Sequence, residues 1–250
     1  MADKHSRLMV YRVFAQTIGY SARVLADAAV GKMSVQSVDR VLERWSRQMY
    51  DTGHTSLDMR GMAHARAGQS YVVMSNHQSL LDVPTVIRAF PGSIRMVSKK
   101  ELGNIPIFGQ AIKAAGTVMV DRNNREAAIE ALSGAGDLLE HGVSLWIAPE
   151  GTRSKDGRLL PFKKGGFHVA LQLGVPILPV FIEGTRQILQ TKTLTALPGQ
   201  HVQIRFAPPV PTDGKTVDDL PELMGTVRHR MLELAREMGA LAGEELDEAA

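Results

Sequence analysis

Short apolar segments alternate with helix-like segments from about residue 55 onward, and this alternation limits the possible folds more than any other feature of the chain. Each apolar segment has the length of a buried strand, and most are rich in β-branched residues. The expected strands are YVVMS (71–75), IRMVS (94–98), TVMV (117–120), SLWIA (144–148), ILPVFI (177–182) and VQIRF (202–206). This order favours an α/β fold, with a mostly parallel sheet covered by helices on both faces.

The segments between these strands have the character of helices. We expect helices near 79–90, 104–115, 124–141 and 165–174, and a final helix over 221–238. Gly134 and Gly136 weaken the third of them, because glycine is a poor helix former, so a break is expected there.

Residues 6–52 are expected to form two helices, which divides the chain into an N-terminal segment (1–54) and an α/β domain with its C-terminal helix (55–250). Apolar residues of the first helix recur every three or four positions and form one stripe: Leu8, Tyr11, Ala15, Ile18, Ala22, Leu25 and Ala29. The second helix has an apolar stripe and a basic face that carries Arg40, Arg44 and Arg47. Such a hairpin either packs on the main domain or also contacts lipid, and both interpretations remain open.

Composition limits the classes of function. A chain of 250 residues with 44% hydrophobic and 22% charged residues is typical of a globular protein with a substantial core. The net charge of +3 is too small to indicate a nucleic-acid partner, whereas the pI near 9.2 is compatible with anionic substrates or lipid headgroups. The absence of cysteine excludes a thiolate nucleophile, and the eight histidines show no paired ligand spacing. We therefore expect no metal and no cofactor, and no apolar run is long enough to predict a membrane-spanning helix.

The segment NHQSLLD (76–82) follows the first expected strand of the α/β domain. Ser79 and Asp82 have the spacing of a helix-capping pair, which is a purely structural interpretation. Alternatively, Asp82 fixes the tautomer of His77 and stabilises its protonated form, so that His77 can deprotonate an alcohol as a general base.

Basic side chains follow three other expected strands. Lys99, Arg122 and Arg153 each lie just after a strand, and ligands gather at the carboxyl ends of parallel strands. Each cation alone is better explained as a solvated surface residue. Together they indicate a site for a phosphate group, which guanidinium and ammonium groups bind well, and Gly151 would allow close approach of the backbone.

The tetrapeptide EGTR occurs twice, at 150–153 and 183–186, each time after an apolar run. The flanking sequences differ, since FKKGG (162–166) follows the first copy and has no counterpart after the second. We therefore reject an internal repeat and assign phosphate binding to Arg153, with Arg186 as a less favoured contributor to the same cleft.

Four blocks, in order, resemble the lysophosphatidic acid acyltransferase family, the 1-acylglycerol-3-phosphate O-acyltransferases among the glycerolipid acyltransferases. They are NHQSLLD (the NHx4D motif of the family), GTVMVDR (116–122), PEGTRS (149–154) and VPILPV (175–180). The resemblance covers roughly residues 55 to 210. Met119 with Val120, and Ala148, stand where the family often has aromatic residues, which leaves acyl-chain preference open.

The resemblance implies roles for individual residues. His77 would be the general base and Asp82 its orienting partner. The residues implied to hold the glycerol phosphate are Lys99, Arg122, Glu150, Gly151, Thr152 and Arg153. Pro176 would lie on the apolar acyl side.

The resemblance also implies an activity. An acyl group would pass from acyl-CoA or acyl-carrier protein to the free hydroxyl of a lysophospholipid, above all 1-acylglycerol 3-phosphate, giving phosphatidic acid. No acyl-enzyme is expected, because the chain has neither cysteine nor a G-x-S-x-G elbow. The alternatives are another acceptor, such as glycerol 3-phosphate or a lyso-ornithine-type lipid, and a non-catalytic lipid-binding protein. The expected location is the membrane surface, at the cytoplasmic face of the inner membrane, as a monotopic or peripheral protein.

Overall fold

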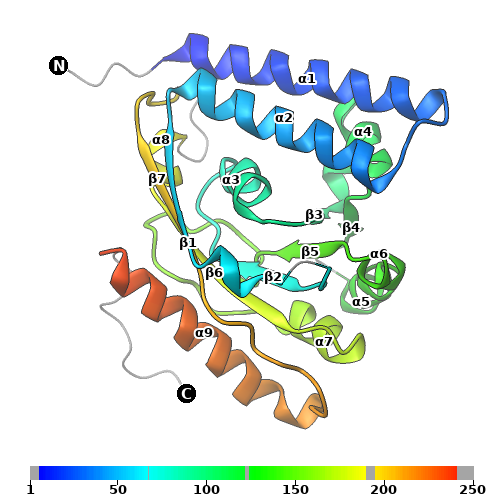
Figure 1. Cartoon of the computed structure of the whole chain (residues 1–250), viewed down its shortest axis with the longest axis vertical. Helices are drawn as coiled ribbons and strands as arrows, with labels where there is room; N and C mark the ends of the chain where they lie inside the picture. Colours follow the sequence, from blue (N-terminus) through cyan, green and yellow to red (C-terminus); the bar gives the residue numbers. More distant parts are fainter. Residues whose placement is uncertain (1–5, 67, 122–123, 190–194, 241–250) are drawn as a thin grey trace.

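The computed structural model describes residues 6–66, 68–121, 124–189 and 195–240. Within these ranges one sheet of seven strands has the order β1-β7-β6-β2-β5-β3-β4 (Figure 1). All neighbouring strands run parallel except β6 and β7, which are antiparallel. The strands are β1 (Ser56–Arg60), β2 (Val72–Ser75), β3 (Ile94–Lys99), β4 (Val118–Val120), β5 (Ser144–Ile147), β6 (Ile177–Glu183) and β7 (His201–Phe206). The predicted α/β fold with a mostly parallel sheet is confirmed.

The longer helices agree largely with those expected from the sequence, whereas α8 and the 3-10 segments were not predicted. The expected break in the third helix occurs between α5 and α6, and the final helix is present as α9. The helices are α1 (Arg7–Ala29), α2 (Val35–Gly53), α3 (Asp82–Ala89), α4 (Phe108–Ala114), α5 (Arg125–Ser133), α6 (Gly136–Glu140), α7 (Gly165–Gln172), α8 (Thr185–Ile188) and α9 (Leu220–Glu237). The 3-10 segments are η1 (Met62–His64), η2 (Lys100–Asn104) and η3 (Val217–Asp219).

Side chains of the central strand β2 alternate between two core layers, as the two-residue period of a strand requires. Val73 packs in the cluster that contains Val86 of α3. Val72 and Met74 pack in the cluster that contains Val227 of α9. The sheet therefore separates the α1–α3 side of the molecule from the α7 and α9 side (Figure 1), as predicted.

The N-terminal hairpin packs on the α/β domain through α2. The hydroxyl groups of Tyr50 and Thr85 of α3 lie 2.6 Å apart in the core, and burial raises the pKa of Tyr50. Arg95 of β3 donates to Asp39 of α2 at 2.6 Å. The helix α2 is thus held by polar contacts to α3 and β3, and α1 adds apolar packing on α4.

The apolar stripe predicted for α1 does not form the packed face of this helix. Met9 and Val24 are buried against the rest of the protein, whereas Leu8 and Tyr11 of the predicted stripe are 59% and 65% exposed. The helix therefore has one apolar face toward the protein and another toward the outside. No helix in the described ranges is long and apolar enough to cross a membrane.

Candidate functional site

The carboxyl ends of β2 to β6 lie at one edge of the sheet, because these strands are parallel to their neighbours. His77 follows β2, which lies between β5 and β6. The first EGTR copy follows β5, and the second begins at the last residue of β6. Strand order therefore brings both copies next to the NHQSLLD turn.

His77 and Asp82 form a hydrogen-bonded pair. The distance from His77 Nδ1 to Asp82 Oδ2 is 2.7 Å, and the same oxygen accepts the backbone N–H groups of Gln78 at 2.7 Å and Ser79 at 2.8 Å. A carboxylate can only accept hydrogen bonds, so Nδ1 carries the hydrogen and Nε2 presents a lone pair. Nε2 makes no hydrogen bond with any residue that the structure describes, and 16% of the side chain is exposed. The imidazole is therefore arranged to accept a proton from a bound molecule.

The capping interpretation of Asp82 is compatible with the catalytic one. Its carboxylate accepts the Ser79 N–H, as the acidic member of a capping pair does. The Ser79 hydroxyl, however, accepts the N–H of Leu81 at 3.3 Å, and α3 begins only at Asp82. One carboxylate thus fixes both the start of the helix and the orientation of His77.

Two neighbouring residues fix the position of the turn. Asn76 exchanges two hydrogen bonds with the backbone of Ile182 of β6, at 2.9 and 2.8 Å. The ring of Trp146 of β5 meets the His77 ring edge to face, with centroids 5.6 Å apart. Trp146 is held in turn by a 2.9 Å hydrogen bond from its Nε1 to Ser75 Oγ. Strands on both sides of β2 therefore hold the turn.

Glu150, the first residue of the first EGTR copy, lies behind this turn and is only 2% exposed. Its two carboxylate oxygens accept the N–H of His77 at 2.8 Å and the N–H of Leu160 at 3.0 Å. Ser154 donates its N–H to the carbonyl of His77 at 2.7 Å. Both the N–H and the carbonyl of His77 are thus hydrogen-bonded to the first EGTR segment. Glu150 positions the turn instead of facing a substrate phosphate.

Burial raises the pKa of Glu150 to about 7, although its two backbone hydrogen bonds lower it. The folded protein therefore keeps this proton up to about pH 7, while the unfolded chain releases it near the ordinary value of 4.5. Between these pH values the unfolded state binds fewer protons, so the free energy of unfolding falls as the pH rises.

Glu150→Gln is expected to remove this part of the pH dependence. From pH 4.5 to 7.5 the wild-type free energy of unfolding should fall by about 3 kcal/mol more than that of the variant. Urea unfolding at both pH values measures the difference. Glu222→Gln is the control, because Glu222 has a side chain that is 74% exposed. Equal pH slopes for the wild type and both variants would contradict the assignment.

The predicted phosphate-binding residues lie at the same sheet edge as far as the structure describes them. Lys99 ends β3 and is exposed, and Arg153 is partly buried. Neither side chain makes a hydrogen bond or ion pair with a described residue. One strand, β5, separates β3 from β2, which puts these strands about 10 Å apart. Arg122 lies outside the described residues.

The remaining predicted site residues have different positions. Gly151 adopts a left-handed conformation with φ of 70°, and Thr152 is exposed beside it. Pro176 precedes β6 at the amino end of the strand, where its carbonyl accepts the N–H of Val72 at 3.1 Å. The structure therefore brings Gly151 and Thr152 to the His77 edge and leaves Pro176 at the opposite edge.

Thr185 of the second EGTR copy was not predicted as a site residue. Its hydroxyl donates to Asp82 Oδ1 at 2.5 Å, and both residues are fully buried. The only signal in the sequence was the position of the second copy at a strand end. Trp146 was likewise expected only as part of a strand.

Comparison with known proteins identifies the family. The family model described as Acyltransferase matches residues 56–183. The 1-acyl-sn-glycerol-3-phosphate acyltransferase alpha of Homo sapiens is 41% identical over 183 residues, which are 73% of this chain and 64% of the human protein. The 1-acyl-sn-glycerol-3-phosphate acyltransferase of Saccharomyces cerevisiae is 35% identical over 69% of this chain and 58% of its own length. The chain thus spans less than two thirds of these relatives.

A solved structure is similar over almost the whole chain. The crystal structure of the 1-acyl-sn-glycerophosphate (LPA) acyltransferase PlsC from Thermotoga maritima superposes with a TM-score of 0.76 at 28% identity. The match covers 94% of this chain and 95% of that one. Because the family model also matches more than half of the sequence, this chain belongs to the acyltransferase family.

Proposed function

We propose that this protein transfers a fatty acyl group from a thioester donor to the free hydroxyl of a lysophospholipid. The main acceptor is 1-acylglycerol 3-phosphate, and the product is phosphatidic acid. The observation that carries this proposal is the His77–Asp82 pair, whose Nε2 is open to a substrate at the sheet edge that also bears Lys99 and Arg153. The names of the human, yeast and Thermotoga relatives support the choice of acceptor.

The proposed reaction has one nucleophilic substitution and no acylated residue. His77 Nε2 takes the proton of the acceptor hydroxyl while its oxygen attacks the thioester carbonyl carbon. Asp82 stabilises the imidazolium that forms. The tetrahedral intermediate then expels the sulfur, and the imidazolium returns its proton to give the free thiol of CoA or of the acyl-carrier protein. Lys99, Arg122 and Arg153 are proposed to hold the acceptor phosphate during these steps.

A panel of donors and acceptors tests the function. Purified protein in detergent micelles is incubated with acyl-CoA or acyl-carrier protein and with 1-acylglycerol 3-phosphate, glycerol 3-phosphate or a lyso-ornithine lipid. We expect the highest kcat/KM for 1-acylglycerol 3-phosphate, with phosphatidic acid identified by mass spectrometry. If another acceptor has a higher kcat/KM, that compound is the main acceptor and the assignment of 1-acylglycerol 3-phosphate is wrong. Thioester-independent binding without any product would indicate a lipid-binding protein instead.

We also propose that α1 and α2 attach the protein to an anionic membrane surface as a monotopic element at the cytoplasmic face. The helix α1 lies along the outside of the molecule (Figure 1). Large apolar side chains of this segment are more than half exposed: Leu8 at 59%, Tyr11 at 65%, Phe14 at 67% and Val30 at 64%. Helices that lie in a membrane interface bury an apolar face of this kind among the lipids.

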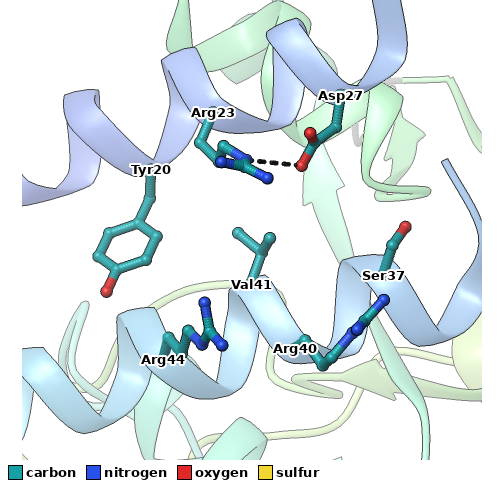
Figure 2. A pocket seen from close by; sticks show the side chains of 7 residues that line it. All are labelled: Tyr20, Arg23, Asp27, Ser37, Arg40, Val41 and Arg44. Atoms are coloured by element: carbon teal, nitrogen blue, oxygen red, sulfur yellow. Dashed lines mark hydrogen bonds and ion pairs between the residues drawn. The ribbon is translucent and has the colours of Figure 1, made fainter. Parts of the chain in front are cut away.

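A pocket of about 200 Å³ between α1 and α2 supports the preference for anionic lipid (Figure 2). Arg23, Arg40 and Arg44 line it, and only Arg23 is ion-paired there, with Asp27 at 2.8 Å. Figure 2 shows Tyr20 reaching from α1 toward α2 and Arg44 reaching back. The side chains of Tyr20 and Arg44 make no hydrogen bond with a described residue. These donors suit the phosphate of a lipid headgroup.

The double variant Tyr11→Ser with Phe14→Ser is expected to bind vesicles at least about tenfold more weakly than the wild type. Transferring a large apolar side chain out of water contributes about 1.5–3 kcal/mol, and 1.4 kcal/mol is a factor of ten. Flotation with phosphatidylcholine vesicles, with and without phosphatidylglycerol, measures binding. Wild-type binding should increase with phosphatidylglycerol.

Val217→Ser is the control for this measurement. Val217 is 60% exposed and begins η3, the segment directly before α9, and α9 lies on the side of the sheet away from α1 (Figure 1). If the control and the double variant lose the same fraction of binding, α1 is not the attachment surface.

A further inference from the structure

We propose that Thr185 is a positioning residue for the reaction: its hydroxyl holds the Asp82 carboxylate so that Oδ2 faces His77. The inference rests on the proposed roles of His77 and Asp82. It starts from the 2.5 Å hydrogen bond between Thr185 Oγ1 and Asp82 Oδ1, in a place where both residues are fully buried. A hydrogen bond to a buried ionised group is strong because water cannot replace it.

The two carboxylate oxygens of Asp82 accept different numbers of hydrogen bonds. Oδ2 accepts three hydrogen bonds, from His77 Nδ1 and the N–H groups of Gln78 and Ser79. Oδ1 accepts only the Thr185 hydroxyl among the described residues. Without this hydroxyl the carboxylate would rotate to share the three N–H donors between its oxygens. The bond to His77 would then lose its geometry, because it is the only one of the three that comes from a side chain.

The residue before Thr185 must be glycine. Gly184, between β6 and α8, has φ of 94°, a left-handed conformation that side chains other than glycine rarely adopt. A Cβ atom at this position would lie 2.3 Å from the carbonyl oxygen of His201. Glycine is therefore required here, and the sharp turn that it allows directs the next residue into the core beneath the NHQSLLD turn.

The segment that carries Thr185 is tied to the NHQSLLD turn on both sides. Before it, Ile182 exchanges two hydrogen bonds with Asn76. After it, the carbonyl of Leu189 accepts the Ser79 hydroxyl at 3.1 Å. These contacts leave Thr185 little freedom to move away from Asp82, which a positioning residue requires.

The two EGTR copies thus act on one turn from opposite sides. Glu150 of the first copy holds the backbone of His77, and Thr185 of the second copy holds the side chain of Asp82. Arg186 of the second copy lies near the loop that follows the first copy, where a Cβ on Gly157 would lie 3.4 Å from Arg186 Nε. The shared tetrapeptide therefore corresponds to two different supports of the same site, because β5 and β6 flank β2.

Thr185→Val keeps the volume of the side chain and removes the hydroxyl, while Thr185→Ser restores it. In the valine variant we expect kcat to fall about 10- to 100-fold, with less than about a twofold change in the KM of the acceptor. The acid limb of the kcat profile should move to lower pH, because a carboxylate that has turned away from His77 stabilises the imidazolium less. The other titratable groups near Asp82 are Tyr50 and Glu150, and both variants retain them. Thr185→Ser should stay within about threefold of the wild-type kcat.

Thr212→Val is the matched control, because Thr212 is also buried but its hydroxyl has no partner among the described residues. It should leave kcat and its pH profile unchanged. Wild-type kcat and pH profile in Thr185→Val would overturn the inference, provided that the wild type is active and His77→Ala is not. An inactive wild type would instead refute the proposed function. If the valine variant does not fold by circular dichroism, Thr185→Ala replaces it with the same expectation.

Discussion

His77→Ala is expected to lower the kcat of acyl transfer about 10²- to 10⁴-fold, the contribution that a positioned general base makes. The variant loses the only imidazole that is paired with Asp82, and an acceptor hydroxyl is a poor nucleophile until it loses its proton. The KM of the acceptor should change little, because the proposed phosphate ligands are other residues. Steady-state formation of phosphatidic acid with excess thioester measures the effect.

His229→Ala is the control for this variant. His229 lies on α9, is 62% exposed and is ion-paired with Glu233 of the same helix, so its removal should leave kcat unchanged. Thermal unfolding of both variants shows whether the fold is retained. If His77→Ala retains more than half of the wild-type kcat, His77 is not the general base.

Asp82→Asn is the second change with a large expected effect, a loss in kcat of about 10²- to 10⁴-fold. The amide fits the space of the carboxylate, and its oxygen can still accept the three N–H groups that now bind Oδ2. Its NH₂ group would face Thr185, whose hydroxyl can turn to accept. The fold is therefore retained, while the negative charge that stabilises the imidazolium is lost.

The pH profile distinguishes this loss of charge from a loss of orientation. In Asp82→Asn the acid limb of kcat should move to lower pH, since the imidazolium has lost its anionic partner. Thr185→Val should shift the limb in the same direction but by less, because it keeps the negative charge of Asp82. Profiles of kcat from pH 5 to 9 for both variants measure the two shifts. A shift in Thr185→Val as large as that in Asp82→Asn would contradict the separate roles of the two residues.

The sequence predicts the strands that are rich in apolar residues. β2 and β5 are buried at every residue, so their composition alone distinguishes them from loops. β1 was not predicted, because SLDMR is a partly exposed edge strand without an apolar run. Its place in the sheet depends on pairing with β7 and on the ion pair between Asp58 and Arg205, which are 147 positions apart.

In the candidate site, too, only the contact between residues close in the sequence could be predicted. The His77–Asp82 contact spans five positions within one turn, so a local motif was sufficient to predict it. The Thr185–Asp82 contact spans 103 positions and depends on the adjacency of β2 and β6. The order of strands in a parallel sheet is not encoded in any local pattern. The supporting role of Glu150 was missed for a related reason, because a motif does not show which of its side chains is buried.

The helix α1 shows a further limit of periodicity. Its outward residues, including Leu8 and Tyr11, have the same helical spacing as a buried stripe. Its buried residues Met9 and Val24 lie on the adjacent face. A helix that is apolar on two faces leaves one of them exposed, and only the packing of the helix on the rest of the protein shows which.

One measurement tests the central claim most directly. Purified wild type and His77→Ala are incubated in mixed vesicles with acyl-CoA and 1-acylglycerol 3-phosphate, and free thiol and phosphatidic acid are quantified in the same samples. If transfer is direct, the wild type forms equal amounts of free thiol and phosphatidic acid. His77→Ala should form both products at least about a hundredfold more slowly. Phosphatidic acid formed by His77→Ala at the wild-type rate, or thiol released by the wild type without phosphatidic acid, would contradict the central claim.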